Sequence, residues 1–280
     1  MYALSIIDVG VALLITALGL RTRAADTLLL FRVPALGLRA VLAMFVFVPA
    51  CTLLMTWVLP LEPAIRASLL ALAVAPMAPI AVGASTRATV SGDYILGLQV
   101  FAVVVSLAAV PVMLALAEHI FDFETAYPVG EIFITVLRQI GLPLAVGLGL
   151  AALLAGKRRR VGLWLERIGN ITLMTGMVLI LALVLPEVWV MAVNGRLLSV
   201  AGFTAIVVLG GRLLGGPDKA TRNNLIMGSA QRHPGVAYLI ATTALPGEKE
   251  LVVVIIVLFV LVSTVATIPY LFKRKQPVVA

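Results

Sequence analysis

The sequence has 280 residues, of which 62% are hydrophobic and 12% charged, and its formal net charge is +8. A soluble domain is roughly 45–50% apolar and about 25% charged, so the composition excludes a soluble globular protein and indicates a polytopic membrane protein. The single cysteine, Cys51, excludes an internal disulfide and a cysteine-rich metal site. No polar stretch is long enough to fold alone. We therefore expect one transmembrane domain over residues 1–280, with no nucleic-acid partner.

Apolar runs of about 20 residues, the length that crosses a ~30 Å hydrocarbon core, recur along the chain. They predict an all-α fold with nine membrane-spanning helices: 4–20, 38–59, 65–91, 93–117, 130–155, 163–190, 197–215, 221–245 and 250–271. The first span has no small-residue cleavage site after it, so we expect a retained helix and not a removable signal peptide.

The loops between these spans sort by charge. Lysines and arginines gather on one side, as in 157–160 and 273–275, whereas most loop carboxylates lie on the other side. Basic short loops stay in the cytoplasm. The pattern predicts that the N-terminus is outside and the C-terminus is cytoplasmic, and we expect the protein to lie in a bacterial inner membrane.

Two of the spans are interrupted. Pro76 and Pro79 break the span 65–91, and the sequence Gln-Arg-His-Pro-Gly at 231–235 breaks the span 221–245. Proline removes a backbone donor and clashes with the preceding helical turn, so both helices are expected to break near mid-membrane. Corresponding broken helices in two halves of a chain are typical of secondary transporters, whose substrate sites they form.

An internal repeat would explain the pair. The run Gly-Ala-Ser-Thr-Arg at 83–87 is similar to Gly-Ser-Ala-Gln-Arg at 228–232. We predict an inverted repeat, with 1–120 as a first half that lacks its leading helix and 128–275 as the second half. Such a repeat would make the two broken helices cross near the midplane.

Arginines within the spans are the strongest candidates for function, because a charge at the bilayer centre costs at least ~2.5–3.5 kcal/mol. Arg232 lies near the middle of its span, with no carboxylate in either broken span to pair with it. We predict that it binds substrate; a structural bond to backbone carbonyls freed by the break is the alternative. Arg87 is the second candidate, with snorkelling to the interface as its alternative. Arg138 is expected to pair with Glu131, one heptad earlier.

The remaining candidate substrate-binding residues are polar: His233, Gln231, Ser85, Thr86 and Asn224. His233 could titrate and couple transport to protons, or it could be a hydrogen-bonded structural histidine. Asn224 could line the site or cap the cytoplasmic start of its span. No nucleophile–base arrangement, phosphate loop or metal-ligand spacing supports an enzyme.

Small residues recur in the fifth span. The run from Gly141 through Pro143 to Gly147 and Gly149 places small residues at spacings of four and two. Small residues let two helix backbones approach closely inside a membrane, so the pattern predicts tight helix packing and needs no functional role.

These segments resemble the bile acid:sodium symporter superfamily over nearly the whole chain. Residues 17–20 and the basic loop after them are similar to that family's second helix, 76–93 to its first crossover, and 228–236 to its second. The resemblance implies core and panel domains, alternating access, and uptake of organic anions driven by sodium.

The sequence departs from the family at the sodium ligands. On this alignment the family's sodium-binding Glu falls on Gly228, its Gln on Arg232 and its Asn on His233. The Ser and Thr ligands of the helix after the first crossover fall on Gly97 and Phe101. Oxygen ligands are thus replaced by cations or by groups without oxygen.

We therefore predict a carrier for a small or amphipathic organic anion, in which Arg232 and Arg87 take the electrostatic role of sodium. Transport would then be facilitated or proton-linked, with no cofactor. Two alternatives stay open: a sodium symporter that uses Ser85, Thr86, Asn224 and backbone carbonyls, and a membrane sensor that binds a ligand without moving it. The partners that we consider are the substrate, the lipid bilayer and a further copy of the chain in a homo-oligomer.

Overall fold

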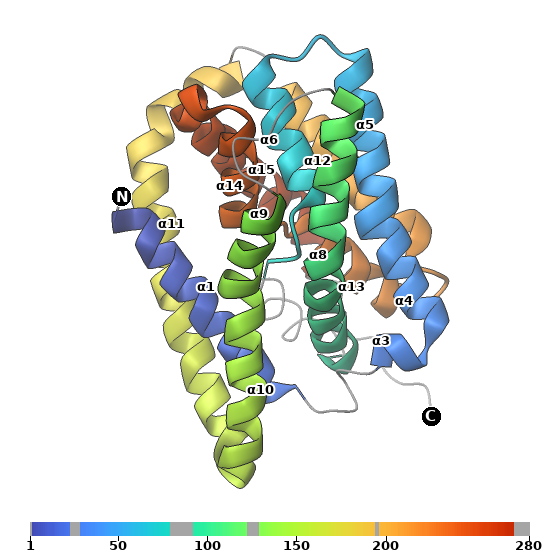
Figure 1. Ribbon diagram of the computed structural model, residues 1–280, viewed down its shortest axis with the longest axis vertical. Helices are drawn as coiled ribbons and strands as arrows, with labels where there is room; N and C mark the ends of the chain where they lie inside the picture. The colour runs from blue at the N-terminus through green and yellow to red at the C-terminus, as the bar shows by residue number, and fades with distance from the viewer. Residues whose placement is uncertain (1, 23–28, 79–91, 122–128, 194–195, 272–280) are drawn as a thin grey trace.

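The computed structural model describes residues 2–22, 29–78, 92–121, 129–193 and 196–271, and within these ranges all regular structure is helical (Figure 1). The helices are α1 (Tyr2–Arg21), α3 (Leu29–Arg32), α4 (Pro34–Val41), α5 (Val48–Val58), α6 (Pro63–Val74), α8 (Gly92–Phe121), α9 (Val129–Val136), α10 (Leu142–Leu154), α11 (Arg158–Val193), α12 (Arg196–Leu214), α13 (Lys219–Ala230), α14 (Pro234–Ala244) and α15 (Lys249–Leu271). Two π-helical stretches, Leu42–Phe47 and Leu137–Gly141, join α4 to α5 and α9 to α10. The predicted all-α class is confirmed.

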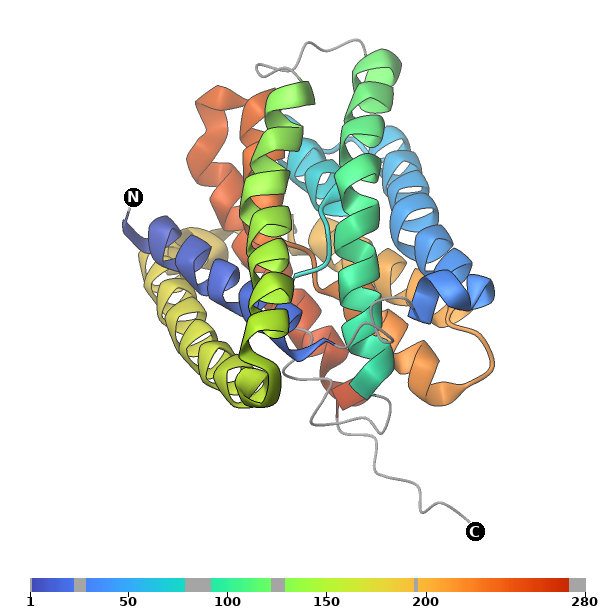
Figure 2. The same ribbon diagram turned by 60° about the horizontal axis from the view of Figure 1, so that its bottom comes forward.

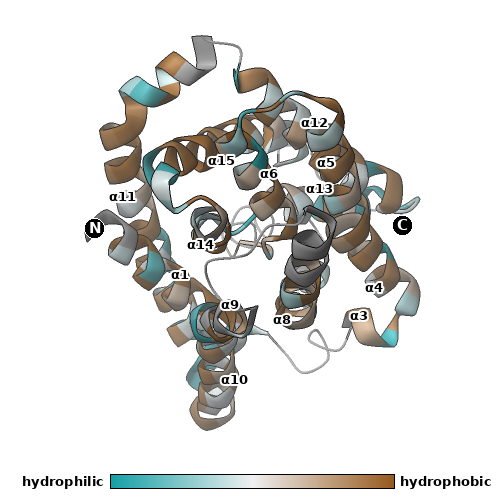
Figure 3. Cartoon of the chain, turned by 45° about the horizontal axis from the view of Figure 1, so that its top comes forward, coloured by the Kyte–Doolittle hydropathy of each residue, from teal (hydrophilic) through white to brown (hydrophobic). Residues whose placement is uncertain are grey.

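Every predicted span overlaps a described helix. Within the described ranges, five helices are long and apolar enough to cross a membrane: Pro34–Val58, Leu137–Leu154, Arg158–Val190, Arg196–Leu214 and Pro246–Tyr270. The hydropathy colouring shows apolar residues over most of the bundle (Figure 3). The protein is therefore a multi-pass membrane protein. The number of nine spans and the inverted repeat over 1–120 and 128–275 stay predictions.

Helices α1, α10 and α11 pack together at one side of the bundle, and we call them the three-helix unit (Figures 1 and 2). A Cβ atom on Gly19 of α1 would lie 2.8 Å from the carbonyl oxygen of Leu144, and one on Gly147 of α10 would run into the carbonyl oxygen of Thr16. Gly147 therefore serves the predicted close packing. Gly149 does not, because a Cβ atom there would have nothing within 4 Å among the described residues.

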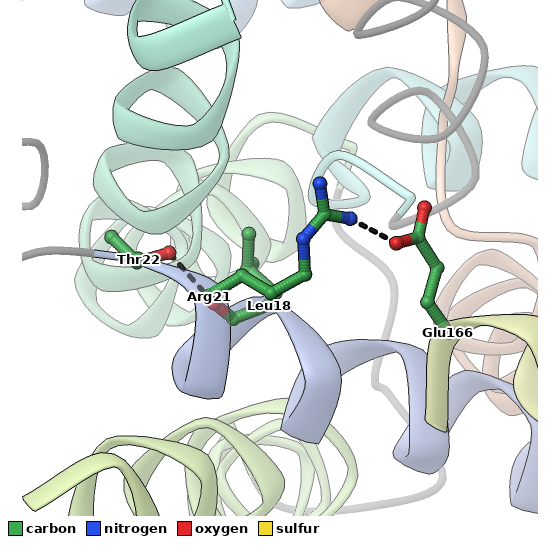
Figure 4. A network of polar contacts seen from close by, with 4 residues as sticks. All are labelled: Leu18, Arg21, Thr22 and Glu166. Atoms are coloured by element: carbon green, nitrogen blue, oxygen red, sulfur yellow. Dashed lines mark hydrogen bonds and ion pairs between the residues drawn. The ribbon is translucent and has the colours of Figure 1, made fainter. Parts of the chain in front are cut away.

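An ion pair fixes the end of α1 against α11. Arg21 in the last turn of α1 pairs with Glu166 of α11, and the Thr22 hydroxyl donates to the carbonyl oxygen of Leu18 at 2.7 Å (Figure 4). The three-helix unit is thus held by close backbone contact along its length and by charge at one end.

The other helices form the second part of the bundle. Helix α12 packs on α13 and α15, and α14 packs on α6 and α15. Phe203 of α12 and Phe259 of α15 are both buried, with ring centroids 5.2 Å apart. Burial of these large aromatic side chains stabilises the packing of α12 on α15. Helices α6, α13 and α14 pack against this pair.

Helix α13 starts at a capping aspartate. The Asp218 carboxylate accepts the backbone N–H of Thr221 at 2.7 Å, and this bond holds the pKa of Asp218 below its ordinary value of 3.8. The cap's contribution to stability is fully present above that value and is lost as the pH falls through the lower folded pKa.

We expect Asp218→Ala to cost about 1 kcal/mol of stability at neutral pH, the usual effect of removing an N-cap. Asp218→Asn keeps an acceptor oxygen, so it should retain most of the stability and lose the acid sensitivity that the carboxylate confers. Thermal melts of the three proteins, from neutral pH to below about 3, test this. Equal melting temperatures of wild type and Asp218→Ala at neutral pH would contradict it.

Candidate functional site

The two interrupted segments lie against each other. Met77 and Arg232 form an isolated antiparallel bridge, the Ala78 N–H donates to the carbonyl oxygen of Gln231 at 2.7 Å, and the His233 N–H donates to that of Pro76 at 2.8 Å. These bonds satisfy backbone groups that each broken helix leaves free, which is what a non-helical segment inside a membrane requires. The predicted contact between the two breaks is present, and we call it the crossing.

Prolines decide where the helices stop. Helix α6 ends at Val74, and Ala75 is extended with ψ of 142° because it precedes Pro76. Helix α13 ends at Ala230, and Pro234 occupies the first turn of α14, where a missing N–H costs nothing. Three residues, 231–233, therefore separate α13 from α14.

Arg232 lies at the centre of the crossing and is 2% exposed. Its Nη1 donates to the carbonyl oxygen of Ala75 at 3.1 Å, and its Nη2 donates to that of Met44 in the π-helical stretch at 3.3 Å. No carboxylate of a described residue forms an ion pair with it. The geometry matches the structural alternative for Arg232, a bond to carbonyl groups freed by the break.

Helix ends explain why a cation is favourable there. Helices α6 and α13 both end at the crossing, and the C-terminus of a helix carries roughly half a negative charge on its unsatisfied carbonyl groups. The guanidinium of Arg232 donates to the carbonyl group that follows α6 and is itself two residues beyond α13. It is a permanent cation at two negative helix ends.

His233 is the N-cap of α14. Its Nδ1 accepts the backbone N–H of Val236 at 3.3 Å, so the proton of the neutral ring is on Nε2. The side chain is 1% exposed, and Nε2 is buried without a hydrogen-bond partner among the described residues. Capping supports the structural interpretation of His233, but it leaves one N–H donor free.

An apolar cavity of about 430 Å³ lies between the three-helix unit and the crossing. Its polar lining comes from Asp8 of α1, Gln231 at the break, Tyr238 of α14, and Thr264 and Thr267 of α15. Its apolar lining is Ile7, Met174, Met177, Val178, Ile180, Leu181, Met227, Pro234, Gly235, Val253, Ile256, Val257, Val260, Leu261 and Val265. The N-terminus of α14 borders this cavity, and a helix N-terminus favours anions.

A smaller cavity of about 270 Å³ also borders α1. It is lined by Asp8, Val9, Val11, Ala12, Arg138, Gln139 and His233. Asp8 therefore borders both cavities, which we call the apolar cavity and the polar crevice. Sequence reasoning missed Asp8, although a carboxylate one turn inside a predicted span was a signal by the same desolvation argument that singled out Arg232.

The structure separates the predicted site residues. Gln231 borders the apolar cavity, His233 borders the polar crevice, and Arg232 lines neither. Asn224 is fully buried in α13, and its amide has no partner in the part of the chain that the structure describes. The candidates Ser85, Thr86 and Arg87 lie outside the described residues.

The described positions that align with the family's sodium ligands carry no side-chain oxygen: Gly97, Phe101, Gly228, Arg232 and His233. A Cβ atom on Gly228 would lie 3.0 Å from Cδ2 of Leu98 and 3.1 Å from Sδ of Met77, so apolar groups crowd the place of the carboxylate. Phe101 packs edge-on against Phe31, with ring centroids 4.9 Å apart. The family's sodium-binding carboxylate therefore has no counterpart at Gly228.

No curated protein sequence matches the chain. The family model described as the sodium bile acid symporter family matches residues 8–198, which is more than half of the chain and runs from α1 through the first break into α12. The family is one of transporters, in accord with apolar helices, two broken segments in contact and cavities beside them. The chain belongs to the sodium bile acid symporter family.

Proposed function

We propose that the protein is a secondary transporter that moves a small or amphipathic organic anion across the bacterial inner membrane by alternating access, without a sodium co-ion. The observation that carries the proposal is the buried guanidinium of Arg232, bonded to the carbonyl oxygens of Ala75 and Met44. It acts through its charge at the crossing, while Gln231 and His233 border the cavities that would hold substrate.

The argument rests on what a bound sodium ion would contribute. In broken-helix transporters, unwound backbone carbonyls and helix C-terminal ends coordinate the cation. Here an arginine already donates to such carbonyls, and a guanidinium stays ionised and cannot dissociate from the chain. The positive charge is therefore supplied in every state of the transport cycle, and no ion has to be carried to provide it.

The surroundings suit an anion with an apolar body. The apolar cavity offers a large hydrophobic wall, whose burial contributes about 25 cal/mol per Å² of apolar surface. The N-terminus of α14 and the field of Arg232 both favour negative charge at the edge of this cavity. An amphipathic anion would place its body against α11 and α15 and its charged group toward the break.

The two-part architecture supports alternating access. The apolar cavity has walls from α1 and α11 on one side and from α14 and α15 on the other. The three-helix unit has its own close packing through Gly19 and Gly147. Rocking of this unit against the crossing would open the cavity to either side while both parts keep their internal contacts.

Uptake by proteoliposomes tests the proposal. Labelled taurocholate and labelled hexanoate serve as probes, with sodium, potassium or N-methylglucamine as the only cation. We expect counterflow of at least one probe at the same rate, within about twofold, in all three salts, since a twofold change is only about 0.4 kcal/mol. Loss of counterflow on removal of sodium would overturn the sodium-independent mechanism, and binding without counterflow in any salt would indicate a sensor.

One observation favours the sodium-coupled alternative. The amides of Asn224 in α13 and Gln99 in α8 are fully buried and have no partner among the described residues, and these two helices pack on each other. Amide oxygens can bind a small cation. If these amides coordinate sodium, uptake by the wild-type protein will require sodium, and Asn224→Ala will weaken that requirement. If the proposal holds, sodium will not change uptake by the wild-type protein or by Asn224→Ala.

A further inference from the structure

The polar crevice holds two charges of opposite sign that do not pair with each other. Asp8 of α1 and Arg138 of the π-helical stretch before α10 both line it, and neither forms an ion pair with a described residue. The side chain of Glu131, the partner predicted for Arg138, lies outside the described residues. Both charged side chains remain exposed. A carboxylate and a guanidinium thus face a shared space without neutralising one another.

Two further polar groups in this crevice lack partners. Nε2 of His233 and Oε1 of Gln139 are buried, and neither has a hydrogen-bond partner within the described ranges. A buried polar group without a hydrogen bond is destabilising. These two buried atoms, beside the exposed and unpaired charges of Asp8 and Arg138, therefore indicate a ligand. The donors are Arg138 and His233, and the charged acceptor is Asp8.

Asp8 also connects this crevice to the apolar cavity, because it lines both. A ligand could therefore place a polar headgroup beside Asp8, Arg138 and His233 and an apolar chain against α11 and α15. A headgroup with only a negative charge would meet the Asp8 carboxylate at close range. A headgroup with only a positive charge would be repelled by the like charge of Arg138.

We infer that Asp8, Arg138 and His233 form a headgroup site for a zwitterion, an ammonium group beside a carboxylate or sulfonate on an apolar chain. This inference rests on the proposed carrier function and narrows its substrate class: the anionic group of the substrate is accompanied by an amine. Arg138 and the Nε2–H of His233 donate to the anionic group, and Asp8 accepts from the ammonium group. The apolar cavity holds the chain.

Three ligands of equal chain length separate the charge requirements: norleucine, hexanoate and hexylamine. Their binding is measured by scintillation proximity on the purified full-length protein in nanodiscs. We expect norleucine to bind about tenfold more tightly than hexanoate or hexylamine, because a charged hydrogen bond is worth about 1.5–3 kcal/mol and 1.4 kcal/mol is tenfold.

The variants assign each charge. Asp8→Asn should weaken norleucine binding about tenfold and leave hexanoate unchanged or tighter, because the like charge is removed. Arg138→Gln should weaken norleucine and hexanoate but not hexylamine. Asp8→Glu keeps the negative charge, so it should keep the preference for norleucine over hexanoate. This variant controls for misfolding as the cause of weaker binding in Asp8→Asn. The control Glu62→Gln removes a carboxylate that lines neither cavity and pairs with Arg196 at 2.8 Å, so it should change no affinity.

Equal binding of norleucine and hexanoate to wild type, or an equal effect of Asp8→Asn on both, would overturn the zwitterion site. If norleucine and hexanoate bind equally but counterflow without sodium persists, the zwitterion site is wrong and the proposed transport function is still supported. If no ligand binds and neither taurocholate nor hexanoate is transported, the proposed function itself fails.

Discussion

Arg232→Ala is expected to lower the stability of the protein by about 2–4 kcal/mol and to make the remaining stability depend on sodium. The variant leaves two buried carbonyl oxygens, of Ala75 and Met44, without their donors. An unsatisfied buried acceptor costs about 1–3 kcal/mol, and removal of a buried charge relieves part of that cost. The negative ends of α6 and α13 also lose their cation.

The sodium dependence of the Arg232→Ala variant tests whether the guanidinium takes the place of a bound cation. The space left by the guanidinium is bordered by carbonyl oxygens and helix C-termini, which are ligands that transporters offer to sodium. A cation that binds only the folded state raises stability by RT ln(1 + [L]/Kd), about 2.7 kcal/mol at a hundredfold excess over Kd. Thermal unfolding of the purified variant should shift upward in sodium relative to N-methylglucamine, and wild type should not shift.

Two further variants control this experiment. Arg222→Ala removes an arginine of α13, the helix that ends two residues before Arg232. The Nη1 of Arg222 donates to the carbonyl oxygen of Gly216 at 3.3 Å, outside the crossing. Arg222→Ala should lower the stability of the protein only slightly, and its melting temperature should not depend on sodium. Arg232→Lys keeps one charge but not the planar fork, so its stability should be intermediate. A melting temperature of Arg232→Ala equal to wild type, or one indifferent to sodium, would show that the guanidinium does not act as a fixed cation.

Gly147→Ala should destabilise the three-helix unit, whereas Gly149→Ala, two residues away on the same helix, should not. A Cβ atom on Gly147 meets the carbonyl oxygen of Thr16, which is backbone and cannot swing away, so α1 and α10 must move apart. Overpacking costs about 1–3 kcal/mol where side chains can adjust, and we expect about 3 kcal/mol here. At Gly149 there is open space, and alanine gains up to about 1 kcal/mol of helix propensity.

Thermal unfolding and counterflow of the two variants check this prediction together. Separation of α1 from α10 displaces Asp8 of α1 and Arg138 of the π-helical stretch that leads into α10. Gly147→Ala should therefore lose transport as well as stability. Gly149→Ala should keep both. Similar melting temperatures for the two variants would show that the contact between α1 and α10 yields easily.

The sequence alone predicted much of the site's framework. Hydropathy located the helices, because membrane helices must satisfy their backbone internally and therefore read as long apolar runs. Pro76 and Pro234 located the breaks, since proline acts on its own helix and needs no knowledge of the fold. The spacing of small residues in one helix also predicted that Gly147 serves close packing. The same spacing includes Gly149, and the two glycines can be distinguished only when the position of the partner helix is known.

The environment of each polar side chain required the tertiary structure. The sequence showed that Arg232 was buried near a break, but the two carbonyl oxygens that it binds belong to residues 157 and 188 positions earlier. Asp8, Arg138 and His233 come from three different elements, and their convergence on the polar crevice follows only from the packing of α1 between α10, α11 and the crossing. Helix positions and breaks are local properties of the chain, and sequence by itself determined them. Which charges meet, and which of them remain unpaired, depends on contacts between segments far apart in sequence, and only the tertiary structure decided that.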